Sequence, residues 1–335
     1  MLLLGWWWIP RNHCTSAATT SSVFGENLFY QLLAVFWSTF KFLAAMAGEL
    51  SDAPIVLITG CSAGGLGESL ALAFHAKGCR VFATSRTLSS MEQLRVAGID
   101  TFELDVTKTE SIVAARERVE GATGGKLDIL VNNAGQSYPY ATSDASMDKV
   151  RALFDVNFFG ALEMVQAFLP LLLVSSDARI VQIGSLSGIM PTPFGVSYNT
   201  SKAALQSLSD TLRVELAPFN IKVVHIVLGN VQTPITKPWH RLPQDSLYLP
   251  IKDIYQSRRI ENFMDNAHQR APVARDIVDE ALKREPRAWW WGGKNSLIIW
   301  FIYSFLPRRC LDWVLSRHFG LTKLSELRSH QRKTL

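Results

Sequence analysis

The stretch VLITGCSAGGLGESLALAF, residues 56–74, decides the fold. An apolar run passes through a glycine cluster into a segment long enough for a helix. Gly60 allows a sharp turn after the run, and Gly65 and Gly67 let the backbone approach a pyrophosphate and a neighbouring strand closely. Free amides at a helix start bind anions, supported by the helix dipole. The pattern predicts a nucleotide-binding loop, with a glycine-rich turn that binds no ligand as the alternative.

Six apolar, β-branched-rich runs recur along residues 54–230, and helix-length segments separate them. Because the runs are continuous rather than alternating, they favour strands buried on both faces. The rhythm predicts an α/β fold, a doubly wound parallel sheet of the Rossmann type with three αβα layers and a ligand at the carboxyl ends of its strands. We expect a single domain with a helical lid and an aromatic C-terminal extension. The runs are residues 55–60, 80–85, 101–106, 127–135, 179–185 and 222–229.

Composition narrows the class of partner. The 335 residues carry a formal net charge of +5, and the basic residues are scattered, which argues against nucleic acid as a partner. A mildly basic surface suits an anionic membrane or a phosphorylated small molecule equally well. The four cysteines show neither paired nor metal-like spacing. We therefore expect reduced thiols in a reducing compartment and no metal site.

The ends of three further runs indicate which nucleotide binds. Arg86 follows the second run, where an NAD-binding fold would place an acidic residue on the ribose, and an arginine there suits the 2′-phosphate of NADP(H). A solvated surface arginine is the alternative. Asp105 could accept a hydrogen bond from the adenine amino group, or cap the following turn. Asn132, in VNNAG (131–135), has donor and acceptor atoms suited to tying adjacent strand ends together.

Four polar residues form a pattern suited to chemistry between a carbonyl and an alcohol. Tyr198 and Lys202 lie one helical turn apart, so the ammonium is expected to lower the pKa of the phenol and let it exchange a proton with a substrate oxygen. Lys202 could also hold the nicotinamide ribose. Ser185 could donate a hydrogen bond to the same oxygen, and Asn157 could hold a water that relays protons to the lysine. Each residue has an ordinary structural explanation alone, but their order behind a phosphate loop favours an acid/base pair.

In these motifs the sequence resembles the short-chain dehydrogenase/reductase family, over roughly residues 54–235. The resemblance implies an NADP-binding catalytic domain in which Tyr198 is the acid/base, Lys202 lowers its pKa and Ser185 polarises the carbonyl, while Asn157 supports the proton relay. The sequence departs from the family by one extra residue in the glycine loop and by Leu228, where the family usually has proline. The implied cofactor contacts are Thr59, Gly60, Ser62, Gly65, Leu66, Gly67, Arg86, Asp105, Asn132, Ala134, Tyr198, Lys202, Val231 and Thr233.

The loop variant TGCSAGGLG and the C-terminal SFLPRRCLDW are similar to a fungal branch of that family, the one resembling 1-acyldihydroxyacetone-phosphate reductase. This likeness implies NADPH-dependent reduction of a lipid-linked ketone at the cytosolic face of the endoplasmic reticulum or at lipid droplets, or otherwise in the cytoplasm. A ketoreductase or alcohol dehydrogenase for a polyketide, terpenoid, steroid or retinoid of secondary metabolism is the first alternative. A non-catalytic nucleotide-sensing scaffold is the second, although a sensor needs no proton donor.

The two ends of the chain differ in amino-acid composition from its middle. Residues 1–53 are expected to be an extension in which 28–47 is either a membrane anchor or a segment ahead of a natural start at Met46. Residues 236–286 should form a substrate lid and the last helices. Residues 287–335, rich in tryptophan and basic residues, suit a membrane interface, with a helix packed on the domain or across a homodimer interface as the alternative.

The expected lid carries four cations that could meet a substrate phosphate, although a solvated surface is the commoner explanation for such residues. They are Arg241, Lys252, Arg258 and Arg259.

Overall fold

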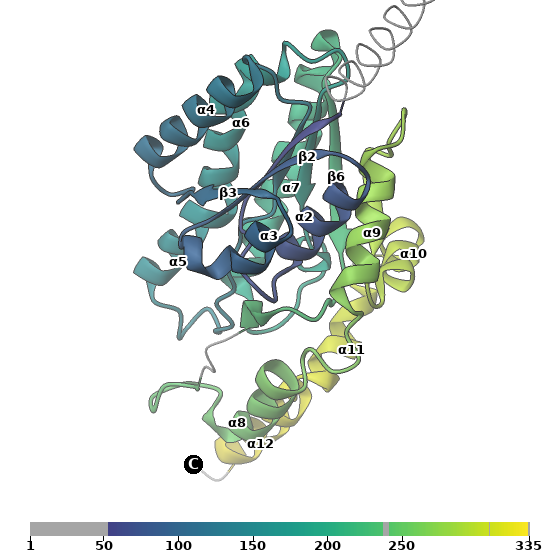
Figure 1. Cartoon of the computed structure of the whole chain (residues 1–335). Coiled ribbons are helices and arrows are strands. Elements are labelled where there is room, and N and C mark those ends of the chain that lie inside the picture. The colour runs from purple at the N-terminus through teal and green to yellow at the C-terminus, as the bar shows by residue number, and fades with distance from the viewer. Residues whose placement is uncertain (1–52, 237–240, 308, 334–335) are drawn as a thin grey trace, which may run out of the picture. The chain divides into compact units, whose positions relative to one another are not determined.

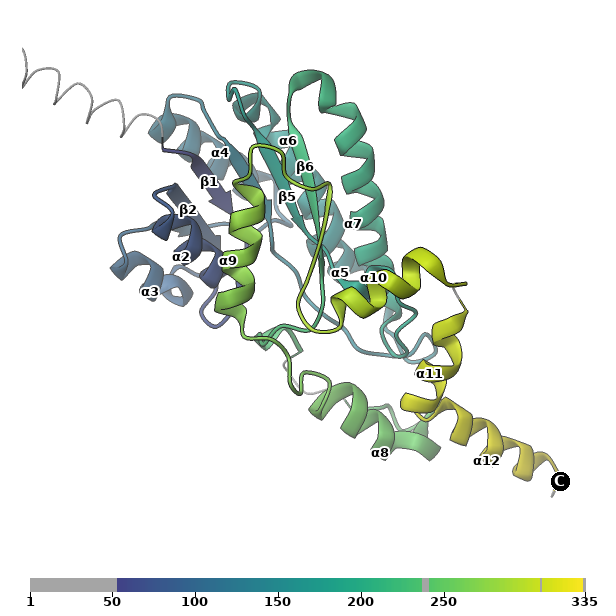
Figure 2. The same ribbon diagram turned by 90° about the vertical axis from the view of Figure 1, so that its right-hand side faces the viewer.

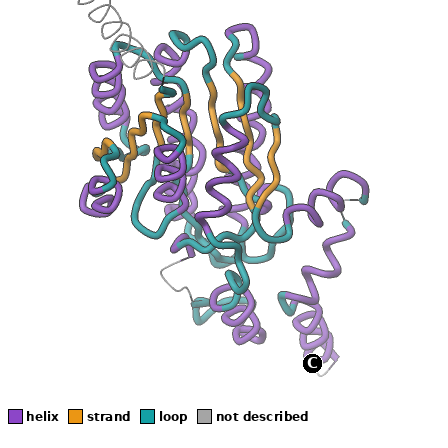
Figure 3. Tube along the Cα trace, turned by 45° about the vertical axis from the view of Figure 1, so that its right-hand side comes forward, coloured by secondary structure: helices purple, strands orange, loops and turns teal. Residues whose placement is uncertain are grey.

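Seven parallel strands form one sheet in the described part of the chain, in the order β3-β2-β1-β4-β5-β6-β7. Figures 1 and 3 show the strands of this sheet with helices around them. The computed structural model describes residues 53–236, 241–307 and 309–333, so the candidate anchor at 28–47 and the start at Met46 lie outside it. The strand order reverses between β1 and β4, where a ligand crevice is expected. The strands are β1 Ile55–Ile58, β2 Arg80–Ser85, β3 Asp100–Glu103, β4 Ile129–Asn132, β5 Arg179–Ile183, β6 Lys222–Leu228 and β7 Trp289–Gly292.

Helices cover both faces of the sheet, which confirms the predicted doubly wound, three-layer fold (Figure 2). Alternate strand residues point to opposite faces, so Val56 and Ile58 pack in one core and Leu57 in the other. The first core includes α2 (Leu66–Ala76), α3 (Glu92–Val96) and α9 (Arg270–Ala281). The second includes α4 (Thr109–Thr123), α6 (Gly160–Leu172) and α7 (Val196–Glu215).

Strand β7 corrects an expectation. Residues 289–291 belong to the segment expected to lie at a membrane interface or to pack on the domain as a helix, yet they form a strand that pairs in parallel with β6. Trp290 is buried in the core, and Trp289 Nε1 donates a hydrogen bond to Asp210 Oδ1 at 2.8 Å. Aromatic residues are good strand formers, and the preceding α9 supplies the crossover that a parallel strand needs. These tryptophans therefore complete the sheet.

The remaining helices gather beyond the carboxyl edge of the sheet, where α8 (Lys252–Tyr255) lies beside α12 (Leu321–Lys333) (Figures 1 and 2). They share an apolar cluster with α11 (Cys310–His318), centred on Phe194 against Tyr255 and Phe319. The lid is thus built jointly from the segment after β6 and from the C-terminal helices. The helix α10 (Ser296–Phe305) packs separately against the domain through Ile299.

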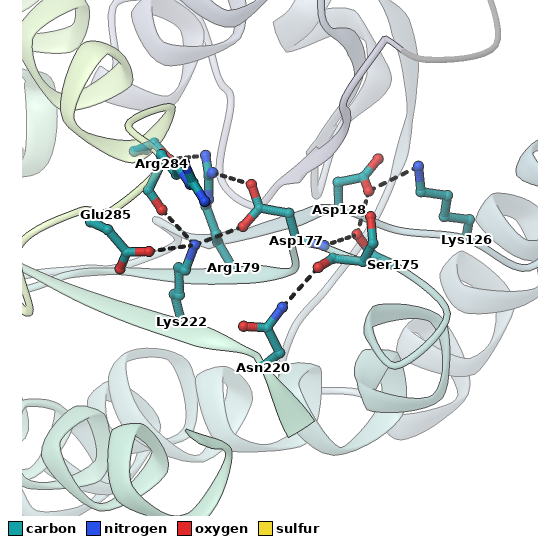
Figure 4. A network of polar contacts seen from close by, with 11 residues as sticks. Lys126, Asp128, Ser175, Asp177, Arg179, Asn220, Lys222, Arg284 and Glu285 are labelled. Atoms are coloured by element: carbon teal, nitrogen blue, oxygen red, sulfur yellow. Dashed lines mark hydrogen bonds and ion pairs between the residues drawn. The ribbon is translucent and has the colours of Figure 1, made fainter. Parts of the chain in front are cut away.

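A polar network fixes the opposite, amino edge of the sheet (Figure 4). The Asp177 carboxylate accepts hydrogen bonds from Arg179 at 2.5 Å and from Lys222 Nζ at 2.9 Å. Lys222 also donates to the Arg284 carbonyl, just beyond α9. The starts of β5 and β6 are therefore tied to the end of α9, well away from the edge where the ligand crevice is expected.

By length and composition, Met147–Leu172 is the helical segment in the described residues that could cross a membrane. It comprises α5 (Met147–Phe154), a π-helical turn (Asp155–Phe159) and α6. Its side chains Met164 and Phe168 are fully buried in the core, which is the ordinary reason for such an apolar helix.

Candidate active site

A cavity of about 540 Å³ lies along the carboxyl edge of the sheet. Arg86 and Asp105 border it beside β2 and β3, and Tyr198 and Arg259 border it beside the lid. Four predicted contacts lie behind its wall rather than in it: Thr59, Gly67, Asn132 and Asn157. The predicted residues that do line it are Gly60, Ser62, Gly65, Leu66, Arg86, Asp105, Ala134, Ser185, Tyr198, Lys202, Val231 and Thr233.

The glycine loop owes its composition to close approaches within the chain. Gly60 adopts φ +75°, and a Cβ there would lie 2.8 Å from the Ala134 Cα. A Cβ on Gly67 would collide with the Gly60 carbonyl. The tight loop leads into the N-terminus of α2, where Gly65 and Leu66 line the cavity. A helix N-terminus behind a glycine loop is a site that suits a pyrophosphate.

Asn133, rather than the predicted Asn132, ties the strand ends together. Its side-chain Nδ2 donates to the Thr59 carbonyl at 2.8 Å and to the Gly60 carbonyl at 3.0 Å. The Thr59 hydroxyl in turn accepts from the backbone amides of Asn133 and Ala134, both at 3.0 Å. Asn132 still lies in β4 and points into the core, where it donates to the Ala161 carbonyl. Thr59 and Asn132 therefore make hydrogen bonds behind the cavity wall and do not line the cavity itself.

The end of the cavity beside β2 carries hydroxyls and a cation. The Ser62 and Ser85 hydroxyls lie 2.8 Å apart, and Arg86 follows directly after β2. Asp105 caps its own turn, because its Oδ1 accepts from the Thr107 amide and hydroxyl at 3.0 and 2.8 Å. Burial raises the pKa of this carboxyl, but the Thr107 hydrogen bonds and nearby Lys108 and Arg86 outweigh it and leave the pKa lowered. Asp105 therefore caps the following turn, and because it also lines the cavity, its contact with adenine stays a prediction.

Tyr198 and Ser185 meet in the cavity wall. Burial raises the pKa of the Tyr198 phenol, and the groups that oppose this rise are the Ser185 hydroxyl and the Arg259 guanidinium. The structure therefore contradicts the expectation that the Lys202 ammonium lowers the pKa of this phenol: the pKa is raised, and Lys202 is not one of the groups that oppose the rise. The Ser185 Oγ accepts from the Ser187 amide at 3.1 Å, which leaves its own hydrogen available for donation. The phenol is thus a protonated group at neutral pH, suited to act as an acid.

Lys202 is only 4% exposed, and its Nζ donates to the Ile183 carbonyl at 2.7 Å. The ammonium lies 5.9 Å from the centroid of the Tyr198 ring, so the two side chains share the predicted helix face. Burial lowers the pKa of Lys202 to about 8. The lysine therefore keeps most of its charge at neutral pH while it can release a proton more readily than a lysine in water.

Asn157 is fixed by the π-helical turn that separates α5 from α6. Its Oδ1 accepts from the Gln136 amide at 2.9 Å, and its Nδ2 donates to the Gln136 carbonyl and to Ser201 Oγ, both at 3.0 Å. A Cβ on Gly135 would lie 3.4 Å from Asn157 Oδ1 and 3.7 Å from Lys202 Nζ, so the amide and the ammonium both border Gly135. Both hydrogens of the side-chain amide are already donated, so within this side chain only Oδ1 could bind a relay water. The water relay stays a prediction.

The loop after β6 is held without the proline that the family usually carries at Leu228. The Gly229 amide donates to the Gly292 carbonyl at 2.8 Å, and the Gln232 amide donates to the His268 carbonyl at 2.9 Å. A Cβ on Gly229 would collide with the Lys294 carbonyl, so this approach requires glycine. Backbone hydrogen bonds thus tie the loop beside Val231 and Thr233 to neighbouring segments without that proline.

The four lid cations differ in their exposure to solvent. Arg241, Lys252 and Arg258 are exposed, whereas Arg259 is buried and lines the cavity together with Phe263 and Met264. Sequence reasoning named Arg259 only as one of four candidates. Its burial follows from its place in a π-helical turn, Gln256–Glu261, which no pattern in the sequence had indicated.

Comparison with known proteins gives consistent results. A family model described as short chain dehydrogenase matches residues 54–243. A protein named short-chain dehydrogenase srdE from Neurospora crassa is 42% identical over 272 residues, covering 81% of this chain and 93% of that protein. A crystal structure of a short-chain dehydrogenase from Streptomyces avermitilis matches with a TM-score of 0.67 and 25% identity over 85% of this chain and 99% of that one. A gluconate 5-dehydrogenase from Burkholderia cenocepacia in complex with NADP and tartrate matches with a TM-score of 0.51 and 26% identity, over 56% and 74% of the chains.

Proposed function

The chain belongs to the short-chain dehydrogenase/reductase family, and on this basis we propose that it is an NADPH-dependent carbonyl reductase that converts a ketone into a secondary alcohol. The family membership makes it an oxidoreductase acting on alcohol or carbonyl groups. The observation that carries the finer proposal is the meeting of Tyr198, Ser185 and Lys202 in the wall of one cavity behind a glycine loop.

In this proposal the protein's residues handle the proton, and bound NADPH supplies the hydride. Tyr198 donates its phenolic proton to the carbonyl oxygen as negative charge develops there. Ser185, whose hydroxyl lies beside the phenol and accepts from the Ser187 amide, donates a hydrogen bond to the same oxygen. Lys202, protonated and held by the Ile183 carbonyl, keeps a positive charge beside the phenol and can restore its proton.

The choice of NADPH over NADH rests on the residues that end β2. No carboxylate stands among Ser85, Arg86 and Thr87, where one would accept hydrogen bonds from a free ribose 2′-hydroxyl. Arg86 and the hydroxyls of Ser62 and Ser85 line the cavity there and fit a 2′-phosphate. The matched gluconate 5-dehydrogenase, which binds NADP, supports the same choice.

The substrate end of the cavity favours a lipophilic ketone. Apolar side chains from Val156, Leu228, Ile235, Phe263 and Met264 line it around the polar groups. A lipid-linked ketone such as 1-acyldihydroxyacetone phosphate fits this description. A polyketide, terpenoid, steroid or retinoid ketone fits the same walls and is the second candidate.

The C-terminal helices support attachment to a membrane surface. In α10 the side chains of Leu297 and Phe301 are exposed, as is Trp313 in α11, with Arg317 stacked over the Trp313 ring. An exposed apolar patch flanked by cations suits the interface of an anionic bilayer. We propose that the enzyme works at the cytosolic face of the endoplasmic reticulum or at lipid droplets, where a lipid-linked ketone would be found. A homodimer that buries this patch is the alternative.

The proposed activity is tested by an NADPH-oxidation screen with the purified full chain. Palmitoyl-dihydroxyacetone phosphate is compared with sterol ketones and polyketide ketones. Turnover of at least one ketone with NADPH is expected, together with formation of the secondary alcohol. Turnover of non-phosphorylated ketones alone would discard the lipid-synthesis substrate, and failure with every ketone and with the corresponding alcohols plus NADP⁺ would contradict the reductase.

A further inference from the structure

Arg259 presents a buried charge without a matching partner. It is 3% exposed and lines the active-site cavity on the lid side. In the described residues no carboxylate lies within ion-pair distance of its guanidinium, and its Nε has no hydrogen-bond partner. The centroid of the Phe263 ring lies 4.3 Å from the guanidinium carbon, so this ring covers one face of the fork.

Such an arrangement is costly unless a ligand completes it. A charge taken out of water loses its hydration, and a buried guanidinium is normally paired and hydrogen-bonded. The neighbouring phenols do not provide the missing charge, because Tyr198 is protonated and the Tyr255 hydroxyl donates its hydrogen to the Pro139 carbonyl at 2.8 Å. The planar fork of arginine matches an oxyanion through two parallel hydrogen bonds.

The place of Arg259 separates this anion from the phosphates of the dinucleotide. The glycine loop and the start of α2 contribute Gly65 and Leu66 to the cavity wall, and a pyrophosphate is expected there. Arg259 instead acts electrostatically on Tyr198, the proton donor. An anion bound to its fork would therefore lie close to the reacting carbonyl and belong to the substrate.

We propose that Arg259 binds an oxyanion of the substrate, a carboxylate or a phosphate carried close to the reacting ketone, and so selects anionic ketones over their neutral counterparts. The inference rests on the proposed reductase function for its assignment of the cavity. Phe263 holds the fork in place, and the apolar walls bind the rest of the substrate.

The test uses two matched pairs of substrates with the full chain and NADPH. Palmitoyl-dihydroxyacetone phosphate is compared with palmitoyl-dihydroxyacetone, and acetoacetate with methyl acetoacetate, so that phosphate and carboxylate are separated. In Arg259→Gln we expect kcat/KM for the preferred anion to fall roughly ten- to hundredfold, as for a lost charged hydrogen bond, while the neutral partner changes less than about threefold. Arg259→Lys should retain part of the preference, and the exposed Arg258→Gln is the matched control.

Two outcomes would overturn the proposal. An equal loss for the anionic and neutral substrates would show that Arg259 acts on Tyr198 rather than on the substrate. A wild-type preference for the neutral member of both pairs would show that no substrate anion binds there. NADPH affinity and circular dichroism of each variant establish that it is folded.

A binding measurement keeps the inference separate from the proposed reaction. Isothermal titration in the presence of NADP⁺ compares decyl phosphate and decanoate with decanol. We expect one of the two anions to bind wild type and Arg258→Gln at least tenfold more tightly than Arg259→Gln, with decanol unchanged. This result would support the anion site even if no ketone were reduced. Equal binding of the anions to all three proteins would contradict it even if ketones were reduced.

Discussion

At the residue scale, the cations around the cavity divide the work. Lys202 is held by a backbone carbonyl, Arg259 lines the cavity on the lid side and acts on Tyr198, and Arg86 lines it beside the end of β2. The Tyr–Lys spacing was enough to predict that Tyr198 and Lys202 would lie together in the cavity wall. The role of Arg259 could not be predicted, because burial of one arginine among four depends on how the lid folds over the strands.

The prediction that Asn132 ties the strand ends together was wrong for a similar reason, since Asn133 makes those hydrogen bonds. Both are short amides at the end of one strand, and strand periodicity decides which points into the core and which toward the glycine loop. The register of β4 places Asn132 in the strand, so its neighbour makes the bonds to Thr59 and Gly60. A one-residue shift in the expected strand would have reversed the assignment.

Arg86 gives a prediction at this scale. Replacing it by glutamine should raise KM for NADPH roughly ten- to hundredfold, because a charged hydrogen-bonding partner of the 2′-phosphate is lost. KM for NADH should change less than about threefold. The measurement is steady-state kinetics with both nucleotides, and the exposed Arg151→Gln is the control. A wild type that prefers NADH, or equal effects on both nucleotides, would contradict the assignment of NADPH.

At the scale of elements, the first six strands follow from continuous apolar runs, and the seventh does not. The sequence at 289–291 is compatible with a strand or with a membrane interface, since both favour tryptophan. Packing of Trp290 into the core and the bond from Trp289 to Asp210 decide between them. Helix α9, Arg270–Ala281, lies within residues 236–286, where the last helices were expected.

Glu280 links α9 to β7 and carries a prediction about stability. Its side chain is 1% exposed and accepts hydrogen bonds from Lys283 Nζ at 2.7 Å and from Arg287 Nη2 at 2.5 Å. Burial alone would raise the pKa of Glu280, but the bonds from Arg287 and Lys283 outweigh it and lower the pKa to about 2. Because the ionised form is favoured in the folded state, it stabilises the protein fully above the unfolded pKa near 4.5 and loses this effect as the pH falls toward 2.

Glu280→Gln should therefore lower the free energy of unfolding at pH 7 by about 3 kcal/mol, from a shift of a little over two pKa units. The difference from wild type should shrink below roughly pH 4.5. Urea unfolding at a series of pH values measures it, with the exposed Glu285→Gln as the control. A difference that stays constant from neutral to acid pH would show that the charge of Glu280 is not the cause.

At the scale of the whole molecule, the cavity is closed by two segments far apart in the sequence. The lid after β6 and the helices α11 and α12 share the cluster around Phe194 and Phe319. Domain boundaries drawn from composition at residue 287 could not anticipate this, because the apolar residues of α11 and α12 serve partly as core and partly as surface. The outer side chains of α10 and α11 remain exposed.

That surface yields a prediction. Leu297, Phe301 and Trp313 are 71%, 53% and 67% exposed, and their joint replacement by serine should weaken binding to phosphatidylcholine–phosphatidylserine vesicles more than about tenfold, since each buried apolar side chain contributes about 1.5 kcal/mol or more. Flotation of the full chain measures binding. Serine replacements at the exposed Val96, Val214 and Phe219 are the control.

Two results would contradict membrane attachment through this surface. Equal vesicle binding by the triple variant and wild type would place attachment elsewhere in the chain. A wild-type dimer in sedimentation that becomes monomeric in the triple variant, without vesicle binding by either, would assign the surface to a homodimer interface.

The central claim is that the Tyr198 hydroxyl delivers the proton when a ketone is reduced, and single-turnover reduction by Tyr198→Phe with saturating NADPH tests it most directly. Because a general acid contributes roughly a hundredfold or more to such a step, we predict a loss of at least that size, with NADPH affinity unchanged within about threefold. Reduction by the phenylalanine variant within a few fold of the wild-type rate would contradict the account.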